Sequence, residues 1–153
     1  MRRIAFFAMA GALSLCPLQA QTTGADFSYS PVSPGSWTYR AVTGGSEAAF
    51  VDGTGTTRMV IACGKLTRLV TLSRISAAPA ATLSFWTSSA TRDLSSRFDQ
   101  PSGRVIVQVG AMDPLLDALT FSRGRFAVSM PGMAALIMPA GTEIAHVVED
   151  CRA

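Results

Sequence analysis

Two carboxylates, Asp113 and Asp117, are four residues apart in a segment that predicts a helix, and side chains at this spacing share one helix face. Paired carboxylates can perform the acid–base chemistry that glycosidases use. Asp113, however, precedes Pro114 and is expected to cap the helix, because proline suits the first helical position. Asp117 is expected to face solvent. We therefore predict structural roles for both residues rather than a glycosidase site.

The chain has one histidine, His146, which acyl-transfer chemistry would need as a base beside a nucleophile. We expect it on a helix, near Glu143 and Asp150, which lie three residues before it and four residues after it. The sequence contains no G-x-S-x-G motif and no serine followed three residues later by lysine. One histidine and two cysteines are also too few ligands for a zinc site. The sequence thus predicts no catalytic residue, no metal site and no cofactor.

Arg123 and Arg125 flank Gly124 where the helix is expected to end. Two guanidinium groups can hold a carboxylate or a phosphate, so this pair is the candidate anion or partner contact. The simpler interpretation is that both cations stabilise the C-terminus of the helix. Arg125 would then begin one strand of a hairpin.

Two further features could bind a ligand. Four aromatic residues fall in predicted strands, where such side chains belong to the core more often than to a binding surface: Trp37, Tyr39, Phe85 and Trp86. The glycines at 53–55 lack the spacing of a phosphate-binding loop and lie between two strands instead of before a helix. Neither feature defines a site from the sequence alone.

The first 20 residues have the pattern of a secretory signal peptide. Arg2 and Arg3 give a positive start, 13 uncharged residues follow at 4–16, and the small residue Ala20 precedes the expected cleavage site. This apolar run is shorter than the roughly 20 residues of a transmembrane helix. The alternatives are a retained N-terminal anchor and a lipoprotein modified at Cys16. The predicted location is the periplasm or the exterior, with membrane contact only through the leader before cleavage.

Cleavage after Ala20 leaves 133 residues, which is enough for one domain. Loss of the leader lowers the count of basic residues from 13 to 11 against 10 acidic ones, a net charge of +1. No basic stripe survives, which argues against nucleic-acid binding. Residues 21–36 are rich in Thr, Gly, Ser and Pro and predict a flexible lead-in. Residues 37–153 are expected to form a single disulfide-bridged, β-rich domain.

Two cysteines remain after export, and an oxidising compartment favours a bridge between Cys63 and Cys151. The bridge would close a loop of 89 residues, and the chain-entropy model gives such a loop about 4.6 kcal/mol as an upper value. One alternative is a pair of buried free thiols, which is typical of a cytosolic protein. Another is a redox-active pair, for which the C-x-x-C motif is missing.

Short alternating segments predict strands at 37–42, 48–51, 58–63, 68–75, 82–87, 104–109, 125–130 and 134–138. The polar stretch at 88–102 predicts a long loop or a single helical turn around Leu94 and Phe98. The pattern indicates a mainly β (α+β) fold: an antiparallel β-sandwich or open barrel of seven or eight short strands, with two short helices near the C-terminus.

The first predicted helix opens at Asp113 and ends at Gly124. Its expected core-facing residues are Leu115, Leu116 and Leu119, with Phe121 or Ser122. The second covers 142–152, with Thr142 as its N-cap. Its apolar face is formed by Ile144, Val147, Val148 and Cys151. A helix this short is marginal alone in water, so this face must dock on the sheet.

Several of these features together resemble a group of small uncharacterised exported proteins of alphaproteobacteria, over about residues 36–152. They are Trp37, Cys63, D-P-L-L-D-A-L-T-F-S-R-G-R-F-A-V at 113–128 and V-V-E-D-C-R at 147–152. The layout is remotely similar to the invasion-associated locus B proteins and to the VasI-like accessory proteins of type VI secretion. The second internal cysteine pair of the locus B family is missing. The resemblance implies an exported, disulfide-bearing and mostly β protein, and it carries no functional residue across.

These observations predict an exported, non-enzymatic envelope protein: a binding or accessory module in the periplasm, with an envelope protein as its partner. The alternative is a small periplasmic hydrolase or an inhibitor of one. Substitution of His146, Asp113 and Asp117 would separate the two, because an enzyme would lose activity with its fold intact.

Overall fold

The computed structural model describes residues 25–153. The predicted signal peptide, its cleavage site at Ala20 and the alternative lipidation site at Cys16 lie outside the described residues. Among the helices in 25–153, none has the length and apolar character needed to cross a membrane.

The described chain forms ten strands and two helices. In order they are β1 (Gly35–Val42), β2 (Gly45–Asp52), β3 (Thr57–Gly64), β4 (Leu69–Ile75), β5 (Thr82–Trp86), β6 (Thr91–Ser95), β7 (Arg97–Asp99), β8 (Arg104–Gly110), α1 (Pro114–Thr120), β9 (Phe126–Met130), β10 (Met133–Met138) and α2 (Thr142–Arg152). The predicted mainly β fold with two short helices is confirmed, although the strands number ten instead of seven or eight.

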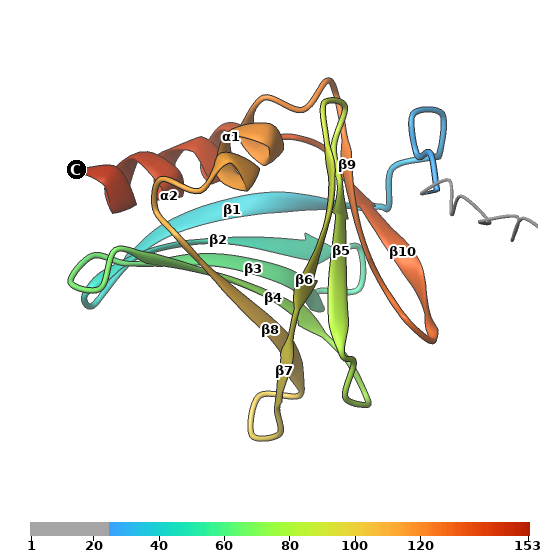
Figure 1. Ribbon diagram of the computed structural model, residues 1–153, viewed down its shortest axis with the longest axis horizontal. Helices are drawn as coiled ribbons and strands as arrows, with labels where there is room; N and C mark the ends of the chain where they lie inside the picture. The colour runs from blue at the N-terminus through green and yellow to red at the C-terminus, as the bar shows by residue number, and fades with distance from the viewer. Residues whose placement is uncertain (1–24) are drawn as a thin grey trace, which may run out of the picture.

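The strands pair in two antiparallel sheets, which within residues 25–153 do not close into a barrel. The first sheet has the order β1-β2-β3-β4-β8-β7 and the second the order β10-β9-β5-β6. Figure 1 shows the second sheet standing beside the first, with both helices above the space between them. β6 and β7 follow each other in the chain but belong to different sheets, so the chain changes sheet at the bend around Ser96.

The prediction of a loop or helical turn at 88–102 is wrong, because the chain forms β6 and β7 there. β6 is an edge strand in which only Leu94 is partly buried, so its residues show no apolar–polar alternation. Its strand conformation is fixed by the register with β5, in which Leu83 faces Leu94. Pairing of this kind depends on the neighbouring strand and leaves no local signal in the sequence.

Helix α1 begins as predicted and ends early. The Oδ1 atom of Asp113 accepts a 2.9 Å hydrogen bond from the backbone N–H of Leu115, which confirms the N-cap. The helix ends at Thr120, with Phe121 as its C-cap, while Gly124 lies at a positive φ of 75° in the turn before β9. Phe121 is exposed, so the core-facing residues of this segment are Leu115, Leu116, Leu119 and Ser122.

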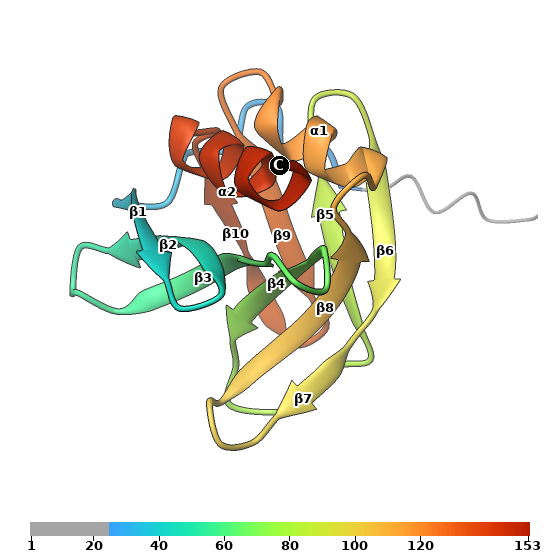
Figure 2. The ribbon, with the colours of Figure 1, turned by 90° about the vertical axis from the view of Figure 1, so that its left-hand side faces the viewer.

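Helix α2 packs on β1, β2 and β3, as Figure 2 shows from the side. Its predicted apolar face is confirmed, because Ile144, Val147, Val148 and Cys151 are all buried. Its N-cap is Gly141, not Thr142, and it makes no side-chain capping bond. The backbone lies so close to Trp37 that a Cβ atom on Gly141 would come within 3.2 Å of the indole. The close approach therefore favours glycine over a capping side chain.

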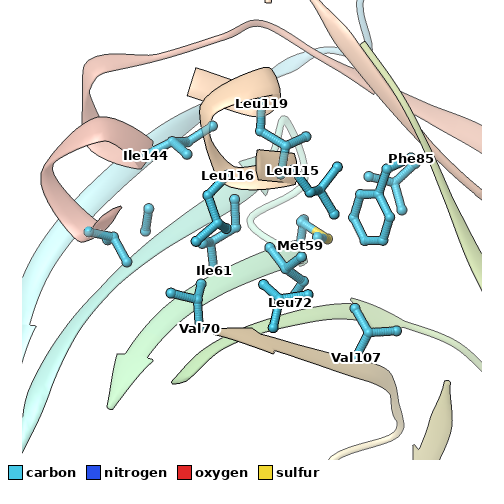
Figure 3. Packing of buried hydrophobic residues seen from close by; sticks show 14 of the residues in the cluster. Met59, Ile61, Val70, Leu72, Phe85, Val107, Leu115, Leu116, Leu119 and Ile144 are labelled. Atoms are coloured by element: carbon cyan, nitrogen blue, oxygen red, sulfur yellow. The ribbon is translucent and has the colours of Figure 1, made fainter. Parts of the chain in front are cut away.

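The core lies where the helices meet both sheets. Figure 3 shows the leucines of α1 facing Met59, Ile61, Val70 and Leu72 of the first sheet, with Phe85 of the second sheet beside them. Each such side chain contributes about 1.5–3 kcal/mol on full burial. Trp37 is 8% exposed and Phe85 is fully buried, so these two candidate binding aromatics belong to the core.

Cys63 and Cys151 are joined in a disulfide, as predicted, with their Cα atoms 5.4 Å apart. The bridge connects the end of β3 to the last turn of α2. It holds the C-terminal helix on the sheet at the end opposite to its contact with Trp37.

Arg74 of β4 is only 3% exposed and links the two sheets. Its Nη1 atom donates a 2.6 Å hydrogen bond to the carbonyl oxygen of Val128, and Nη2 donates a 2.5 Å bond to that of Ala134. Burial lowers the pKa of Arg74 to about 10, which leaves it charged at neutral pH. Ser73, on the opposite face of β4, is 6% exposed, so β4 is covered on both faces at this point.

The described part of the lead-in makes specific contacts, whereas its composition predicts flexibility. The backbone N–H of Ser33 donates a 2.8 Å hydrogen bond to the carbonyl of Ile137, and the guanidinium of Arg125 donates to the carbonyl of Ser30. The segment thus runs along β10 and beyond the second sheet, on the side away from the first (Figure 1). The prolines of this segment and its lack of hydrophobic periodicity give no sequence signal for these contacts.

Candidate functional site

His146 lies on the exposed side of α2, as predicted, and contacts β1. Its ring meets that of Tyr39 edge to face, with centroids 5.5 Å apart. The phenol of Tyr39 donates a 2.6 Å hydrogen bond to Asp150, and Lys65 Nζ lies 3.8 Å from the same carboxylate. The hydrogen bond raises the pKa of Tyr39 and lowers the pKa of Asp150. The arrangement ties α2 to β1.

Ser46 of β2 lies beside Tyr39 and Asp150, and it is 1% exposed. Its hydroxyl oxygen lies near the Asp150 carboxylate but outside hydrogen-bonding geometry. Within residues 25–153 it is the only buried side-chain polar atom without a partner. A hydroxyl this deeply covered cannot reach the carbonyl of a substrate. Ser46 therefore does not supply His146 with an accessible nucleophile.

Asp113 and Asp117 are held by different arginines. Arg92 Nη1 lies 2.5 Å from Asp113 Oδ1, and Arg152 Nη1 lies 2.8 Å from Asp117 Oδ1. Asp113 also caps α1, through the same oxygen, Oδ1, that faces Arg92. The two carboxylates are thus paired with separate arginines and not with each other.

Arg123 and Arg125 have separate surroundings. Arg125 donates to the lead-in at Ser30 and is partly buried. Arg123 is exposed, and its backbone N–H donates a 2.9 Å hydrogen bond to Ser88 Oγ. Arg125 therefore has a structural task, while a contact between Arg123 and an external anion stays a prediction.

A cleft of about 460 Å³ opens on the outer face of the second sheet. The lead-in forms one wall and strands β5, β6 and β9 form the floor. We call it the Trp86 cleft; it is lined by Ala25, Phe27, Ser84, Trp86, Thr91, Asp93 and Ser129. Its volume falls within the range of roughly 300–1,000 Å³ that is usual for ligand pockets.

Strand register builds the floor of the cleft. Leu83 and Phe85 of β5 point into the core, so Ser84 and Trp86 point outward. Ser84 is paired with Asp93 on β6 and with Ser129 on β9, which forms a polar row across three strands. Trp86 is paired with Thr91 and stands beside this row.

The lead-in completes an aromatic corner. The rings of Phe27 and Trp86 have centroids 6.0 Å apart and planes at 76°. Trp86 is the one candidate aromatic that lines this cleft, since Tyr39 lies at α2. Phe27 and Asp93 carry no sequence signal, because one lies in the lead-in and the other in a strand that the sequence does not predict.

Asp93 is the only charged residue among those that line the cleft, and it is exposed. The ion pairs found within residues 25–153 all use other carboxylates. The same residues contain no group of three or more side chains that could hold a metal ion. The cleft can therefore offer aromatic rings, a carboxylate and hydroxyl groups to a ligand.

No protein-family model, curated protein or solved structure matches this chain. The chemistry of the Trp86 cleft is therefore inferred from its own residues.

Proposed function

We propose that this protein is an exported, non-enzymatic binding module of the cell envelope, which works in the periplasm and binds its ligand or partner in the Trp86 cleft. The observation that supports this proposal is the composition of the cleft. A half-buried indole, a second ring, a carboxylate that is free of ion pairs and three hydroxyl side chains converge on one concave surface. Paired strands hold the floor in place, as a specific binding site requires.

Three features support export. The first 20 residues have the pattern of a signal peptide. The bridge between Cys63 and Cys151 suits an oxidising compartment. The resemblance of 113–128 and 147–152 to exported alphaproteobacterial proteins points to the same location.

A hydrolase is the weaker alternative. The single histidine contacts Tyr39 and does not line the Trp86 cleft. Asp113 and Asp117 are engaged by separate arginines. An inhibitor of a hydrolase would be one kind of binding module, and its target would appear as the captured partner in the experiment below.

Affinity capture from the envelope fraction of the producing cell tests the proposal. The tagged protein, exported and processed by that cell, is recovered without reductant, and bound proteins and small molecules are identified by mass spectrometry. Trp86→Ala removes the indole that lines the cleft. Phe121→Ala is the matched control, because Phe121 is a 78% exposed aromatic at the end of α1. Both variants are first checked for an unchanged circular dichroism spectrum.

We expect a stoichiometric ligand or partner with the native protein and with Phe121→Ala, and its loss with Trp86→Ala. Recovery of every variant without any companion would overturn the proposal. Equal retention by Trp86→Ala would show that the protein binds through another surface. The mass of the recovered chain also reveals whether residues 1–20 have been removed.

A further inference from the structure

We infer that the Trp86 cleft takes an organic cation, a guanidinium or ammonium group that donates hydrogen bonds. This inference depends on the proposed function, which it sharpens by naming the chemistry of the ligand. It follows from three properties of the cleft: its charge, the angle between its two rings and its surplus of hydrogen-bond acceptors.

The charge of the cleft is negative. Asp93 is the only ionised side chain among the lining residues, and the ion pairs of residues 25–153 leave it free. In the register of the second sheet it faces Ser84, one pair away from Trp86 and Thr91. A carboxylate and an indole on the same floor attract a cation, the first by its charge and the second by the negative face of its ring.

The two rings form a corner. Phe27 and Trp86 are nearly perpendicular, at 76°, with centroids 6.0 Å apart. Rings in this relation can flank a cation from two sides, which is how aromatic cages hold alkylated ammonium groups. Phe27 comes from the lead-in and Trp86 from β5, so the corner exists only because the lead-in docks on the second sheet.

The polar groups of the cleft favour a ligand with several donors. Three hydroxyl oxygens, from Ser84, Thr91 and Ser129, line the cleft together with the Asp93 carboxylate. Hydroxyl and carboxylate oxygens accept hydrogen bonds, and a guanidinium brings five N–H donors while an ammonium brings three. A neutral sugar could also use the hydroxyl groups, but it would leave the charge of Asp93 without a counterpart.

The volume of about 460 Å³ exceeds that of one cationic head group. Two sources of the same chemistry therefore fit: a free small amine or guanidine, and an arginine or lysine side chain of a partner protein together with its backbone. Both would place their cation between Asp93 and the Phe27–Trp86 corner.

The chain contains two tryptophans, which gives the test an internal reference. The ¹⁵N-labelled protein, in the form that the cell exports, is titrated while the two indole N–H signals are followed by NMR. Trp37 is buried, and its Nε1 donates a 2.9 Å hydrogen bond to the carbonyl of Pro139. Its signal should stay fixed, while that of Trp86 should move and saturate.

Three probes separate the sources and the competing class. Agmatine represents a free cation, N-acetyl-arginine-N-methylamide represents an arginine within a protein, and N-acetylglucosamine represents a neutral sugar. We expect saturable shifts of Trp86 with at least one of the first two probes, and the tighter of them identifies the source. We expect no saturable shift with the sugar.

Asp93→Asn removes the charge with little change of shape and should weaken binding of the cation by about tenfold or more, as expected for a hydrogen bond to a charged group. Glu149→Gln is the matched control, because Glu149 is an exposed carboxylate on α2. It should leave the affinity unchanged.

Saturation by the sugar but by neither cation would overturn the inference, and so would cation binding that Asp93→Asn leaves intact. Either result would leave the proposed binding function intact, provided that the native protein captures a ligand or partner and Trp86→Ala does not. Failure of that capture would instead remove the proposed function itself.

Discussion

The phenolic oxygen of Tyr39 lies 2.6 Å from Oδ2 of Asp150, and this hydrogen bond joins β1 to α2 across 111 residues of sequence. Together with the Cys63–Cys151 bridge it fixes the C-terminal half of α2 on the first sheet. Asp150 also draws Lys65 to within 3.8 Å. The helix is therefore held by polar links beside its buried apolar face and by a covalent link within that face.

The Tyr39–Asp150 hydrogen bond should make stability depend on pH at both ends of the scale. The bond lowers the pKa of Asp150 in the folded protein. Its contribution to stability is therefore complete above the ordinary carboxyl pKa of about 3.9, and it is lost as the pH falls through the lower pKa of the folded protein. The bond also raises the pKa of Tyr39 in the folded protein. Its contribution to stability is therefore complete below the ordinary tyrosine pKa of about 10, and it is lost as the pH rises through the higher pKa of the folded protein.

Tyr39→Phe should accordingly lower the melting temperature near pH 7, by an amount that shrinks in strong acid and in strong base. Circular dichroism melts at pH 2.5, 7 and 11 measure this. Tyr29→Phe is the control, because Tyr29 is 97% exposed. An equal decrease in melting temperature at all three pH values would contradict this account of the hydrogen bond.

Removal of the disulfide should cost much of the net stability. Cys63→Ser opens a loop of 89 residues, for which the chain-entropy model gives up to about 4.6 kcal/mol. The melting temperature should fall by roughly 10 °C or more. Reductant should lower the melting temperature of the native protein to a similar extent and leave that of Cys63→Ser unchanged. A native protein that melts equally with and without reductant would contradict the prediction.

Arg74 should be needed for the contact between the sheets. Arg74→Leu leaves the carbonyls of Val128 and Ala134 without their donor, and each unsatisfied buried acceptor costs about 1–3 kcal/mol. Removal of a buried charge offsets part of this cost, so we expect a net loss of about 2 kcal/mol in urea unfolding. Arg97→Leu, at an exposed position on β7, is the control. Equal stability of the two variants would mean that water replaces the guanidinium.

Much of the fold can be predicted from the sequence because its strands alternate. The segment R-V-I-V-Q-V at 104–109 alternates in burial and belongs to β8, and Asp113 followed by Pro114 marks the start of α1. β6 escapes prediction because four of its five residues are exposed. Its conformation depends on β5, which local patterns do not report.

The candidate site is harder to predict for a related reason. Trp86 is a candidate by residue type, but nothing local distinguishes it from Phe85, which belongs to the core. Asp93 reaches the cleft through the register of β5 with β6, and Phe27 reaches it because the lead-in folds back over the second sheet. Both placements are long-range, so only the assembled sheet reveals them.

Arg125 should act on the Trp86 cleft from outside it, as a positioning residue. Its guanidinium donates to the carbonyl of Ser30, and the backbone N–H of Ser30 donates a 3.1 Å hydrogen bond to the carbonyl of Phe27. Arg125→Met should release this turn and loosen the aromatic corner. We expect cation binding to weaken about threefold or more, in line with the roughly 0.5–2 kcal/mol of a cation–π contact.

Arg123→Met is the matched control for this prediction, because Arg123 is exposed, lies two residues away and does not line the cleft. NMR titration with the arginine and agmatine probes measures both variants, and the line width of the Phe27 ring signals reports whether the corner has become mobile. If Arg125→Met binds the probes as tightly as the native protein, the lead-in holds Phe27 without this arginine. If Arg123→Met weakens binding equally, the positive charge of this turn matters more than its contact with Ser30.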